Sequence, residues 1–291
     1  MTQQMAPTVV EALVAGPSGG RRAPRGGRRW GPGSWLLPLY VVLAFVFLLT
    51  PIVQVIAYSF NDSRRNNQQW QGFTLDNWAN VCDQQGVCAA FGMSVLIGVV
   101  ATVIATVLGT LLAIALGRYR FRGRTAVNLL LFLPMATPEV VLGVGLAAQF
   151  LTVGVPKGFW TIVIAHVLFC ISFVVVTVKA RVASLDPALE EAGRDLYGSS
   201  LQVFFRITLP LLLPGIVAAA LLSFSLSFDD FIITKFNAGP VTTFPLWIYT
   251  KKSVPAEANV VASGVFLLAI IVVVIVQVLQ ARRRRRLART P

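Results

Sequence analysis

The chain has 291 residues, of which 56% are hydrophobic and only 13% are charged, and its mean hydropathy is +0.73. Soluble domains carry about 25% charged residues, so this composition excludes a soluble protein and indicates the membrane class. The formal net charge of +13 is high enough for nucleic-acid binding. However, the arginines gather at both termini and in two loops, which is typical of the cytoplasmic flanks of membrane spans, so we expect no nucleic-acid partner.

The two ends of the chain have a different composition from its middle. Residues 1–34 are rich in Gly, Pro and Arg without an apolar period, which predicts a disordered basic tail. The apolar run that follows is too long for a signal peptide. We therefore expect a transmembrane domain at 35–281, followed by a second basic tail at 282–291 that anchors the last span.

Six stretches each have close to the ~20 apolar residues that a bilayer crossing needs. They run over 36–59, 93–117, 126–150, 159–178, 209–234 and 259–280. With both termini inside, 19 of the 25 basic residues lie on the cytoplasmic side. The sequence therefore predicts an all-α integral membrane protein with six transmembrane helices, both termini cytoplasmic, in the plasma or inner membrane.

The loop after the first span, 61–90, contains the tryptophans Trp70 and Trp78, which fit either an interfacial anchor or a surface that receives a partner or substrate.

Cys82 and Cys88 share this loop, which we place outside the membrane, so the sequence is compatible both with a disulfide between them and with two free thiols. Cys170 lies in an apolar run and is expected to pack there. Three cysteines without ligand spacing predict no metal site.

The longest polar interlude with a helical pattern lies between the fourth and fifth spans, at 184–210. Asp186 and Pro187 form a helix start, an oxygen cap followed by proline at the first helical position. One face is expected to carry Leu185, Leu189, Ala192 and Leu196. The other carries Glu190, Glu191, Arg194 and Asp195, and Gly198 is expected to end the helix. The pattern predicts a short amphipathic helix on the cytoplasmic surface.

Three carboxylates fall inside predicted spans: Glu139 in the third, and Asp229 and Asp230 in the fifth. Each costs about 2.5–3.5 kcal/mol at a helix centre, so such residues usually face a cavity or a partner. Pro134 and Pro138 flank the turn of Glu139 and predict a kink there. Adjacent acids suit a polycation better than an anion or a sugar.

A polar stripe follows the fifth span: Ser223, Ser227, Asp230 and Thr234. Their spacing of four, three and four puts them on one face, fit to line a water-filled path, while Asp229 points about 100° away. The alternative is structural, with Asp229 or Asp230 paired with Lys235 or with a basic residue of a neighbouring subunit.

The chain has no Walker-type loop and only one histidine, His166, within a span. We therefore expect no enzymatic chemistry, no catalytic residues and no cofactor in this chain; any ATP and Mg²⁺ would be bound by a partner ATPase.

The segment at 184–210 resembles the EAA loop of permease subunits of binding-protein-dependent ABC importers. Glu191 and Ala192 match, Gly193 replaces the second alanine, and Tyr197 stands at the family's glycine; the register holds at Ile207, Leu209 and Pro210. The resemblance implies a type I ABC importer permease fold and a coupling loop that docks into the ATPase subunit. The coupling residues it implies are Glu190, Glu191, Ala192, Gly193, Asp195 and Gly198. The alternative is a surface helix that only joins two spans.

Further blocks resemble the spermidine/putrescine (PotC-type) permease family. They are Tyr58-Ser59-Phe60-Asn61, Trp70-Gln71-Gly72-Phe73-Thr74, Arg118 to Gly123, Thr137 to Val141, Phe173 to Val178 and Ser227-Phe228-Asp229-Asp230. The resemblance implies that Glu139, Asp229, Asp230 and Trp70 line the polyamine path, and the polar stripe adds Ser227. Lys235 departs from the family pattern and leaves the exact substrate open.

The sequence therefore predicts a permease subunit of an ATP-driven importer of polyamines. The resemblance implies a second permease subunit in a heterodimer, a pair of ATPase subunits and an extracytoplasmic substrate-binding protein. One alternative is an ABC importer for another small solute. An ion-driven secondary transporter or channel, or a scaffold without transport, is less favoured, because neither needs the coupling loop together with intramembrane acids.

Overall fold

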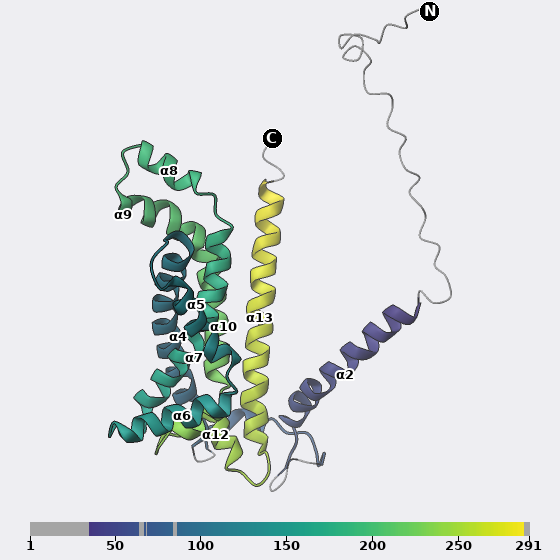
Figure 1. The fold of residues 1–291 in the computed structure, drawn as a ribbon. Helices are drawn as coiled ribbons and strands as arrows, with labels where there is room; N and C mark the ends of the chain where they lie inside the picture. The colour runs from purple at the N-terminus through teal and green to yellow at the C-terminus, as the bar shows by residue number, and fades with distance from the viewer. Residues whose placement is uncertain (1–34, 64–66, 68, 84–85, 288–291) are drawn as a thin grey trace, which may run out of the picture. The chain divides into compact units, whose positions relative to one another are not determined.

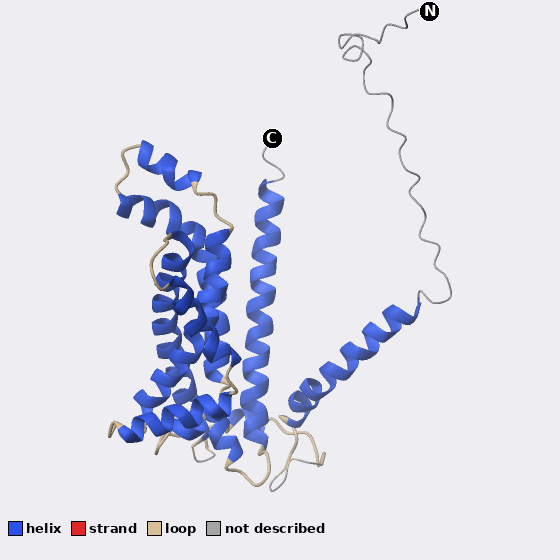
Figure 2. Cartoon of the chain, in the orientation of Figure 1, coloured by secondary structure: helices blue, strands red, loops and turns tan. Residues whose placement is uncertain are grey.

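The computed structural model describes residues 35–63, 67, 69–83 and 86–287, and Figure 1 draws the remaining residues as a grey trace. The predicted tail at 1–34, Arg64, Arg65 and residues 288–291 lie outside the described residues. Helices joined by loops make up the described part, with one isolated bridge between Asn61 and Phe73 (Figure 2). The chain divides into two units, residues up to Ile52 and residues from Val53 onward.

Helix α2 (Leu36–Tyr58) makes up nearly all of the described part of the first unit and continues into the second. It is apolar on all sides, and none of its residues is buried. A helix of 23 residues with this composition is long enough to cross a bilayer. It agrees with the predicted first span.

The second unit is built around three helices, α4 (Val87–Arg118), α7 (Phe159–Ala183) and α10 (Leu209–Phe228) (Figure 1). Their shared core includes Ala105, Leu116, Val174, Val178 and Leu212, all of which are buried. The predicted spans at 93–117 and 159–178 lie inside α4 and α7. The last predicted span lies inside α13 (Ala256–Leu287).

Small residues bring α4 close to α7. Ala105, Gly109, Ala113 and Gly117 follow one another every four residues along α4, so they share a face. A Cβ atom at Gly109 would lie 2.6 Å from Cγ1 and 2.8 Å from Cβ of Val174, and one at Gly117 would lie 2.6 Å from Cγ1 of Val182. Small residues at such positions let membrane helices approach closely, since lipid provides no hydrophobic drive to pair them.

The third predicted span is two helices rather than one kinked helix. Helix α5 (Arg124–Ala136) and helix α6 (Glu139–Thr152) meet at an angle of 109°. Pro138 lacks the N–H that would continue α5, and a proline also disfavours a helical conformation at the residue before it, here Thr137. Counting this bent pair as one crossing, the described helices provide up to six candidate spans, as predicted.

The fifth predicted span, 209–234, is also broken. Helix α10 ends at Phe228, and the chain restarts in α11 (Ile232–Asn237), followed by α12 (Phe244–Tyr249). Asp229 and Asp230 therefore lie in the break and not along a continuous helix. The reason is the Asp230 carboxylate, which binds the first free N–H groups of α11.

Two ends of the second unit carry different elements (Figure 1). One end holds α8 (Ala188–Asp195), α9 (Ser200–Val203) and the π-helical turn η2 (Phe204–Thr208), which leads directly into α10. The other end holds α12 and the start of α4, where Trp247 and Phe244 pack against Val87 and Ala90. The loop between α2 and α4, which contains the short helix α3 (Asp76–Ala79), enters α4 at this second end.

The close approach of α4 to α7 generates a prediction. Gly109→Ala places a Cβ against the stiff, β-branched side chain of Val174, so we expect it to lower the unfolding free energy by about 1–3 kcal/mol. Thermal unfolding of the detergent-purified protein measures this loss. Gly92→Ala in the same helix is the control, because a Cβ there meets nothing within 4 Å. Equal melting temperatures for the two variants would contradict the packing described here.

Candidate substrate path and coupling surface

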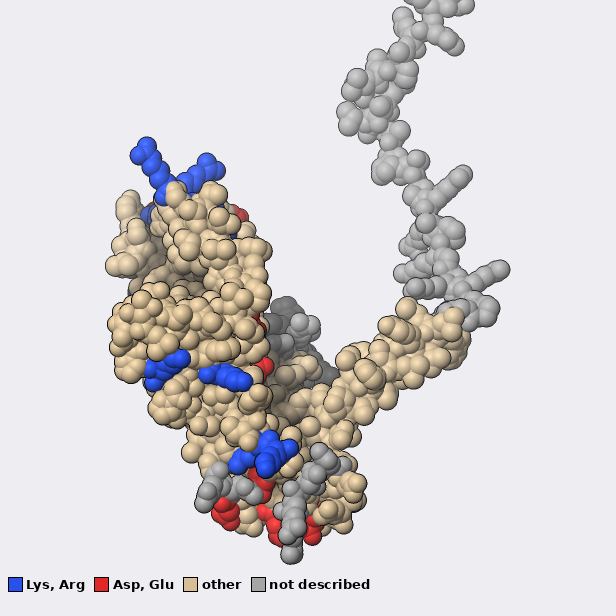
Figure 3. Space-filling view, turned by 60° about the horizontal axis from the view of Figure 1, so that its bottom comes forward, with Lys and Arg blue, Asp and Glu red and all other residues tan. Residues whose placement is uncertain are grey.

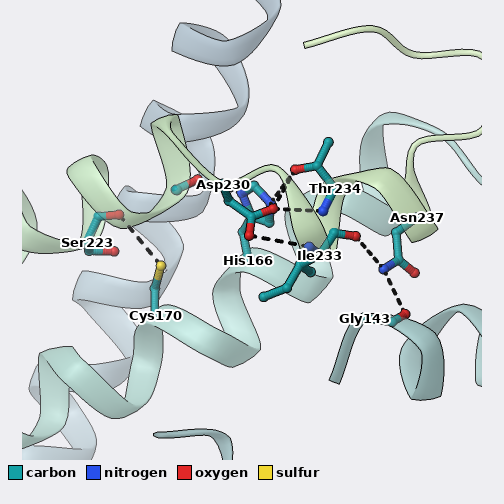
Figure 4. Close-up of polar contacts among 9 residues, drawn as sticks. Gly143, His166, Cys170, Ser223, Asp230, Ile233, Thr234 and Asn237 are labelled. Carbon is teal, nitrogen blue, oxygen red and sulfur yellow. Dashed lines mark hydrogen bonds and ion pairs between the residues drawn. The ribbon is translucent and has the colours of Figure 1, made fainter. Parts of the chain in front are cut away.

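The carboxylate of Asp230 lies in the break between α10 and α11 and binds the start of α11 (Figure 4). Its Oδ2 accepts the N–H of Thr234 at 2.7 Å and the Thr234 hydroxyl at 2.8 Å, and its Oδ1 accepts the N–H of Ile233 at 3.3 Å. A side-chain oxygen at a helix start satisfies backbone donors that have no partner within the helix. Asp230 therefore stabilises the start of α11.

His166 of α7 contacts the same carboxylate (Figure 4). Its Nε2 lies 3.2 Å from Oδ2 of Asp230 and 2.9 Å from Oγ1 of Thr234, while its Nδ1 lies 2.7 Å from Oγ of Ser227. The side chains of His166 and Asp230 are only 2% and 5% exposed. Buried polar groups persist when they have partners, and here both ring nitrogens have one. The imidazole thus links α7 to both sides of the α10–α11 break.

The polar stripe predicted to line a water-filled path faces α7 in the structure. Ser223, Ser227 and Thr234 are buried, and the Cys170 thiol lies 3.6 Å from the carbonyl oxygen of Ser223. The stripe is therefore part of the packing interface between α7 and the α10–α11 segment in this chain. A contact between Ser227 and substrate stays a prediction.

Sequence reasoning misses His166 as a member of this cluster, because a single histidine in an apolar run has no partner at a recognisable spacing. The signal that could have found it is the stripe itself. Four polar residues on one face of a membrane helix need polar partners on a neighbouring helix, and His166 is the one basic residue within the fourth predicted span.

Asp229 and Glu139, unlike Asp230, are exposed in this chain. Asp229 follows the last residue of α10, and Ser225, one turn earlier, is exposed as well. Glu139 is the first residue of α6, just after the break in the third span. The described contacts do not bring Asp229 and Glu139 together. Both carboxylates are free to meet a ligand or a partner subunit.

Lys235 does not pair with the aspartates in this chain, so the structure does not contain the Lys235 form of the structural alternative, and pairing with a basic residue of a neighbouring subunit stays a prediction. Its ammonium lies over the rings of Tyr249 and Phe231, and among the described residues it forms no ion pair. Asp230 pairs with His166 instead.

Asn61 organises the loop that carries Trp70. Its side-chain amide donates to Asn67 Oδ1 at 2.6 Å and to the carbonyl of Gln69 at 2.8 Å, and its Oδ1 accepts the N–H of Gln71 at 2.7 Å. Trp70 is half exposed and meets the ring of Tyr58 edge-on. Figure 3 turns the loop end toward the viewer and shows acidic side chains gathered there beside basic ones. The described contacts do not join Trp70 to the acids of the break.

A disulfide connects Cys82 to Cys88, with a Cα–Cα distance of 5.3 Å. Since Cys88 lies in the first turn of α4, the bond ties the end of this loop to that helix. Cys170 is a buried free thiol. Across the described residues, no cluster of three or more His, Cys, Asp or Glu side chains is arranged to hold a metal ion.

Helix α8 begins at Ala188, one residue later than predicted, with Pro187 at the cap position, and its left-handed ending comes one residue earlier than predicted. The Asp186 carboxylate accepts the N–H of Ala188 at 2.9 Å. At the other end, Tyr197 has a φ of 60°, and the N–H of Gly198 reaches the carbonyl of Gly193 at 3.2 Å. This is a Schellman ending in which Tyr197, and not Gly198, takes the left-handed position. A Cβ at Gly198 would lie 2.6 Å from the Gly193 oxygen, so Gly198 serves the close approach of the chain.

The inner side of α8 is held by polar and tight contacts. Nη2 of Arg118, the last residue of α4, lies 3.0 Å from Oε1 of Glu190, which also accepts the hydroxyl of Thr208 at 3.2 Å. A Cβ at Gly193 would lie 2.6 Å from Cδ1 of Ile207 and 3.2 Å from Cγ2 of Val203, so an alanine here would require these side chains to shift. A cavity of about 580 Å³, lined in part by Arg118, Glu190 and Thr208, lies beneath this contact.

The outer side of α8 carries most of the face predicted to be apolar and is exposed, whereas Leu185, also predicted to share this face, is partly buried against the core. Leu189, Leu196 and Tyr197 are exposed, and residue Tyr197 as a whole is 99% accessible. Glu191, Ala192 and Asp195 are exposed too, while Glu190, Gly193 and Gly198 are partly covered. The predicted coupling residues thus divide into an inner set that holds α8 and an outer set that is free. Exposed apolar patches rimmed by charges are typical of protein–protein contacts.

A protein-family model described as "Binding-protein-dependent transport system inner membrane component" matches residues 105–288. The match covers more than half of the chain, and the chain belongs to this family. Its class is thus the membrane-embedded permease component of an importer.

The curated relatives narrow this class. The chain is 35% identical over 235 residues to the spermidine/putrescine transport system permease protein PotC of Escherichia coli (strain K12), covering 80% of this chain and 89% of that protein. It is 37% identical to PotC of Haemophilus influenzae, with coverages of 80% and 90%. It is 34% identical to the putrescine transport system permease protein PotI of E. coli, with coverages of 77% and 83%.

Solved structures share the fold. A bacterial ABC transporter involved in the import of the acidic polysaccharide alginate matches with a TM-score of 0.64 and 16% identity, covering 89% of this chain and 99% of that chain. The same kind of transporter, in complex with an alginate pentasaccharide-bound periplasmic protein, matches with a TM-score of 0.60 and 18% identity, covering 90% and 99%. The prediction of an ABC importer permease fold is confirmed.

The buried contact between His166 and Asp230 generates a second prediction. His166→Leu removes the imidazole from the buried Asp230 carboxylate, which keeps its hydrogen bonds from Thr234 and Ile233, and also removes the partner of the Ser227 hydroxyl, which we expect to cost about 1–3 kcal/mol of stability. In a background of Asp230→Asn, which keeps an acceptor oxygen for Thr234, the same change should cost at least about 1 kcal/mol less. Thermal unfolding of the four proteins of this cycle measures the coupling. An identical cost of His166→Leu in both backgrounds would show that the two side chains are not coupled.

Proposed function

We propose that this chain is a membrane-spanning permease subunit of an ATP-driven importer that takes up polyamines such as spermidine and putrescine. The importer class follows from the family. The substrate is supported by the relatives, which carry polyamine transport in their names, and by the acids at the α10–α11 break. The observation that carries the proposal is the exposed Asp229 beside the held Asp230.

The charges of the break fit a polycation. A cation that crosses surroundings of low dielectric needs counter-charges, and carboxylates provide them. Asp229 and Glu139 are the exposed acids, and we assign them direct contact with the substrate. Asp230 and Ser227 hold His166, so we assign them the positioning of the break, which sets where Asp229 lies. Trp70, half exposed in the loop, is proposed to meet the substrate as it arrives.

The orientation of the chain follows from charge. We propose that both termini and α8 lie on the cytoplasmic side, because this arrangement puts 19 of the 25 basic residues inside. The α10–α11 break and the loop that carries Trp70 then face the extracytoplasmic side. The protein is multi-pass in the cell's plasma or inner membrane.

The partners follow from the same class. We propose a second permease subunit in a heterodimer, a pair of ATPase subunits that bind ATP and Mg²⁺, and an extracytoplasmic protein that delivers the polyamine. The outer side of α8, with Leu189, Glu191 and Leu196, is the proposed contact with an ATPase subunit. The inner side, through Glu190 and Thr208, is joined to η2 and so to α10.

This connection provides a mechanical route between the two ends. When the ATPase pair closes on ATP, α8 moves with it. Thr208 is the last residue of η2, and α10 runs from there without interruption to the acids of the break, over 20 residues or about 30 Å. A displacement of α8 is therefore transmitted along one continuous helix, α10, to Asp229 and Asp230. Moderate affinity at the acids permits release on the other side.

The same class leaves one alternative, an importer of another small solute. Uptake of labelled putrescine and spermidine by the assembled transporter tests the substrate. We expect Asp229→Asn to raise the KM about tenfold, the value of about 1.4 kcal/mol that one charged contact contributes. Asp76→Asn, which removes an exposed acid in α3, is the control and should leave KM unchanged. Uptake of a neutral or anionic solute instead of polyamines would remove the proposal.

A second experiment tests the ATPase contact. Leu196→Glu places a charge on the exposed apolar face of α8, and burial of an unpaired charge opposes docking. We expect loss of co-purification with the ATPase subunit and loss of uptake. Val153→Glu, at another exposed apolar site at the far end of α6, is the control and should retain the ATPase. Retention of the ATPase by the Leu196→Glu variant would exclude this face as the contact.

A further inference from the structure

The side chain of Lys235 is held by two aromatic rings. Its Nζ lies 4.2 Å from the centroid of the Tyr249 ring and 5.3 Å from that of Phe231. The two rings lie 4.6 Å apart and are tilted by 42°. Ammonium groups within about 6 Å of a ring centroid are attracted by the negative face of the ring. Since Lys235 has no ion-pair partner among the described residues, its ammonium group is held by the two rings.

The chemistry of this lysine matches that of the proposed substrate. A lysine side chain is four methylene groups that end in a primary ammonium, which is one end of putrescine and of the aminobutyl half of spermidine. The structure therefore displays an aminobutyl cation seated on the Phe231–Tyr249 pair. Any free cation of the same kind fits the same rings.

The ring pair is accessible and lies next to the acids of the break. Tyr249 is 61% exposed, and Lys235 is exposed as well. Phe231 follows Asp230 directly and lies two residues after Asp229. Helix α12 brings Tyr249 into ring contact with it, although 18 residues separate them in the chain. Asp229, two residues before Phe231, is the exposed acid nearest to the rings along the chain.

We propose that Phe231 and Tyr249 form an ammonium-binding subsite for the polyamine, and that the side chain of Lys235 is a tethered competitor for that subsite. The inference rests on the proposed function and adds a site and a residue that sets affinity. Because the competitor is part of the chain, its effective concentration at the rings is high. Each polyamine must displace it, so binding is weaker than the rings and acids alone would allow.

The first test is removal of the competitor. Lys235→Met keeps the length of the side chain and deletes the ammonium, so we expect the KM for labelled putrescine in the assembled transporter to fall about two- to fivefold, the effect of one exposed cation–π contact. Lys235→Arg keeps a cation over the rings and should leave KM close to that of the unchanged protein.

A matched control separates competition from a general change of charge. Lys251 also places its Nζ over a ring, 4.6 Å from the centroid of Trp247, but that tryptophan is only 5% exposed and cannot receive a ligand. Lys251→Met deletes the same charge from the same end of the protein. We expect no fall in KM. An equal fall for Lys235→Met and Lys251→Met would overturn the proposal in favour of charge alone.

The second test asks whether the lower KM of Lys235→Met comes from binding of the polyamine to the rings. In the Lys235→Met background, Tyr249→Leu should restore the original KM, whereas Tyr249→Phe, which keeps the ring, should retain the low KM. Immunoblots of the membrane fraction verify that each variant is present in equal amount. An unchanged KM in Lys235→Met, or a low KM that survives Tyr249→Leu, would overturn the subsite.

The two proposals fail in distinguishable ways. Putrescine uptake by the unchanged transporter, with no response to Lys235→Met, removes the subsite and leaves the proposed function intact. The absence of polyamine uptake by the unchanged transporter removes the proposed function and the subsite with it.

Discussion

The arrangement of the second unit depends on one carboxylate. Asp230 accepts N–H groups at the start of α11 and lies against the imidazole of His166, so α7 and α11 meet at its two oxygen atoms, while Ser227 of α10 contacts the other ring nitrogen of His166. In surroundings without water, the free N–H groups at a helix start and an unpartnered imidazole would each be costly. Asp230 accepts the N–H groups of Ile233 and Thr234 and is one of three side chains that contact the imidazole. The break it creates leaves Asp229 outside the packing interface, and two neighbouring acids thereby acquire different environments.

The helix count and the helical class could be predicted from the sequence because apolar length is a direct signal in a membrane protein. The breaks could not, because both depend on particular side-chain contacts. A proline signals a kink at Pro138 but not an angle of 109°. At Asp230 the capping bonds compete with continued helix, and the spacing of the polar stripe is equally compatible with an unbroken helix. The stripe residues share a face in either case, but only the structure shows His166 as their partner.

The sequence identified most residues of the candidate site, but it did not predict which of them are buried and which are exposed. The acids and the α8 segment carry family motifs, whereas their orientation is set by tertiary packing. Glu190 and Glu191 are neighbours in the sequence, yet one is bound to Arg118 and Thr208 and the other is exposed. Lys235 reads as a counter-charge to the aspartates because it is close to them along the chain. The rings of Phe231 and Tyr249 take it instead, and the 18-residue separation of these rings gives no local pattern.

The bend between α5 and α6 bears on how the chain exists before assembly. Helix α5 has 13 residues, about 20 Å, which is less than the ~30 Å hydrocarbon thickness of a bilayer. The turn at Thr137 and Pro138 therefore falls at membrane depth, and residues 138–141 are exposed in this chain. Irregular backbone at that depth is stable only where protein or a water-filled cavity covers it. A copy of the chain without its partner subunit would expose the peptide groups of this turn to lipid. We therefore expect synthesis of this subunit to be matched to synthesis of the protein that covers the turn. Unassembled copies are then expected to be degraded by membrane proteases.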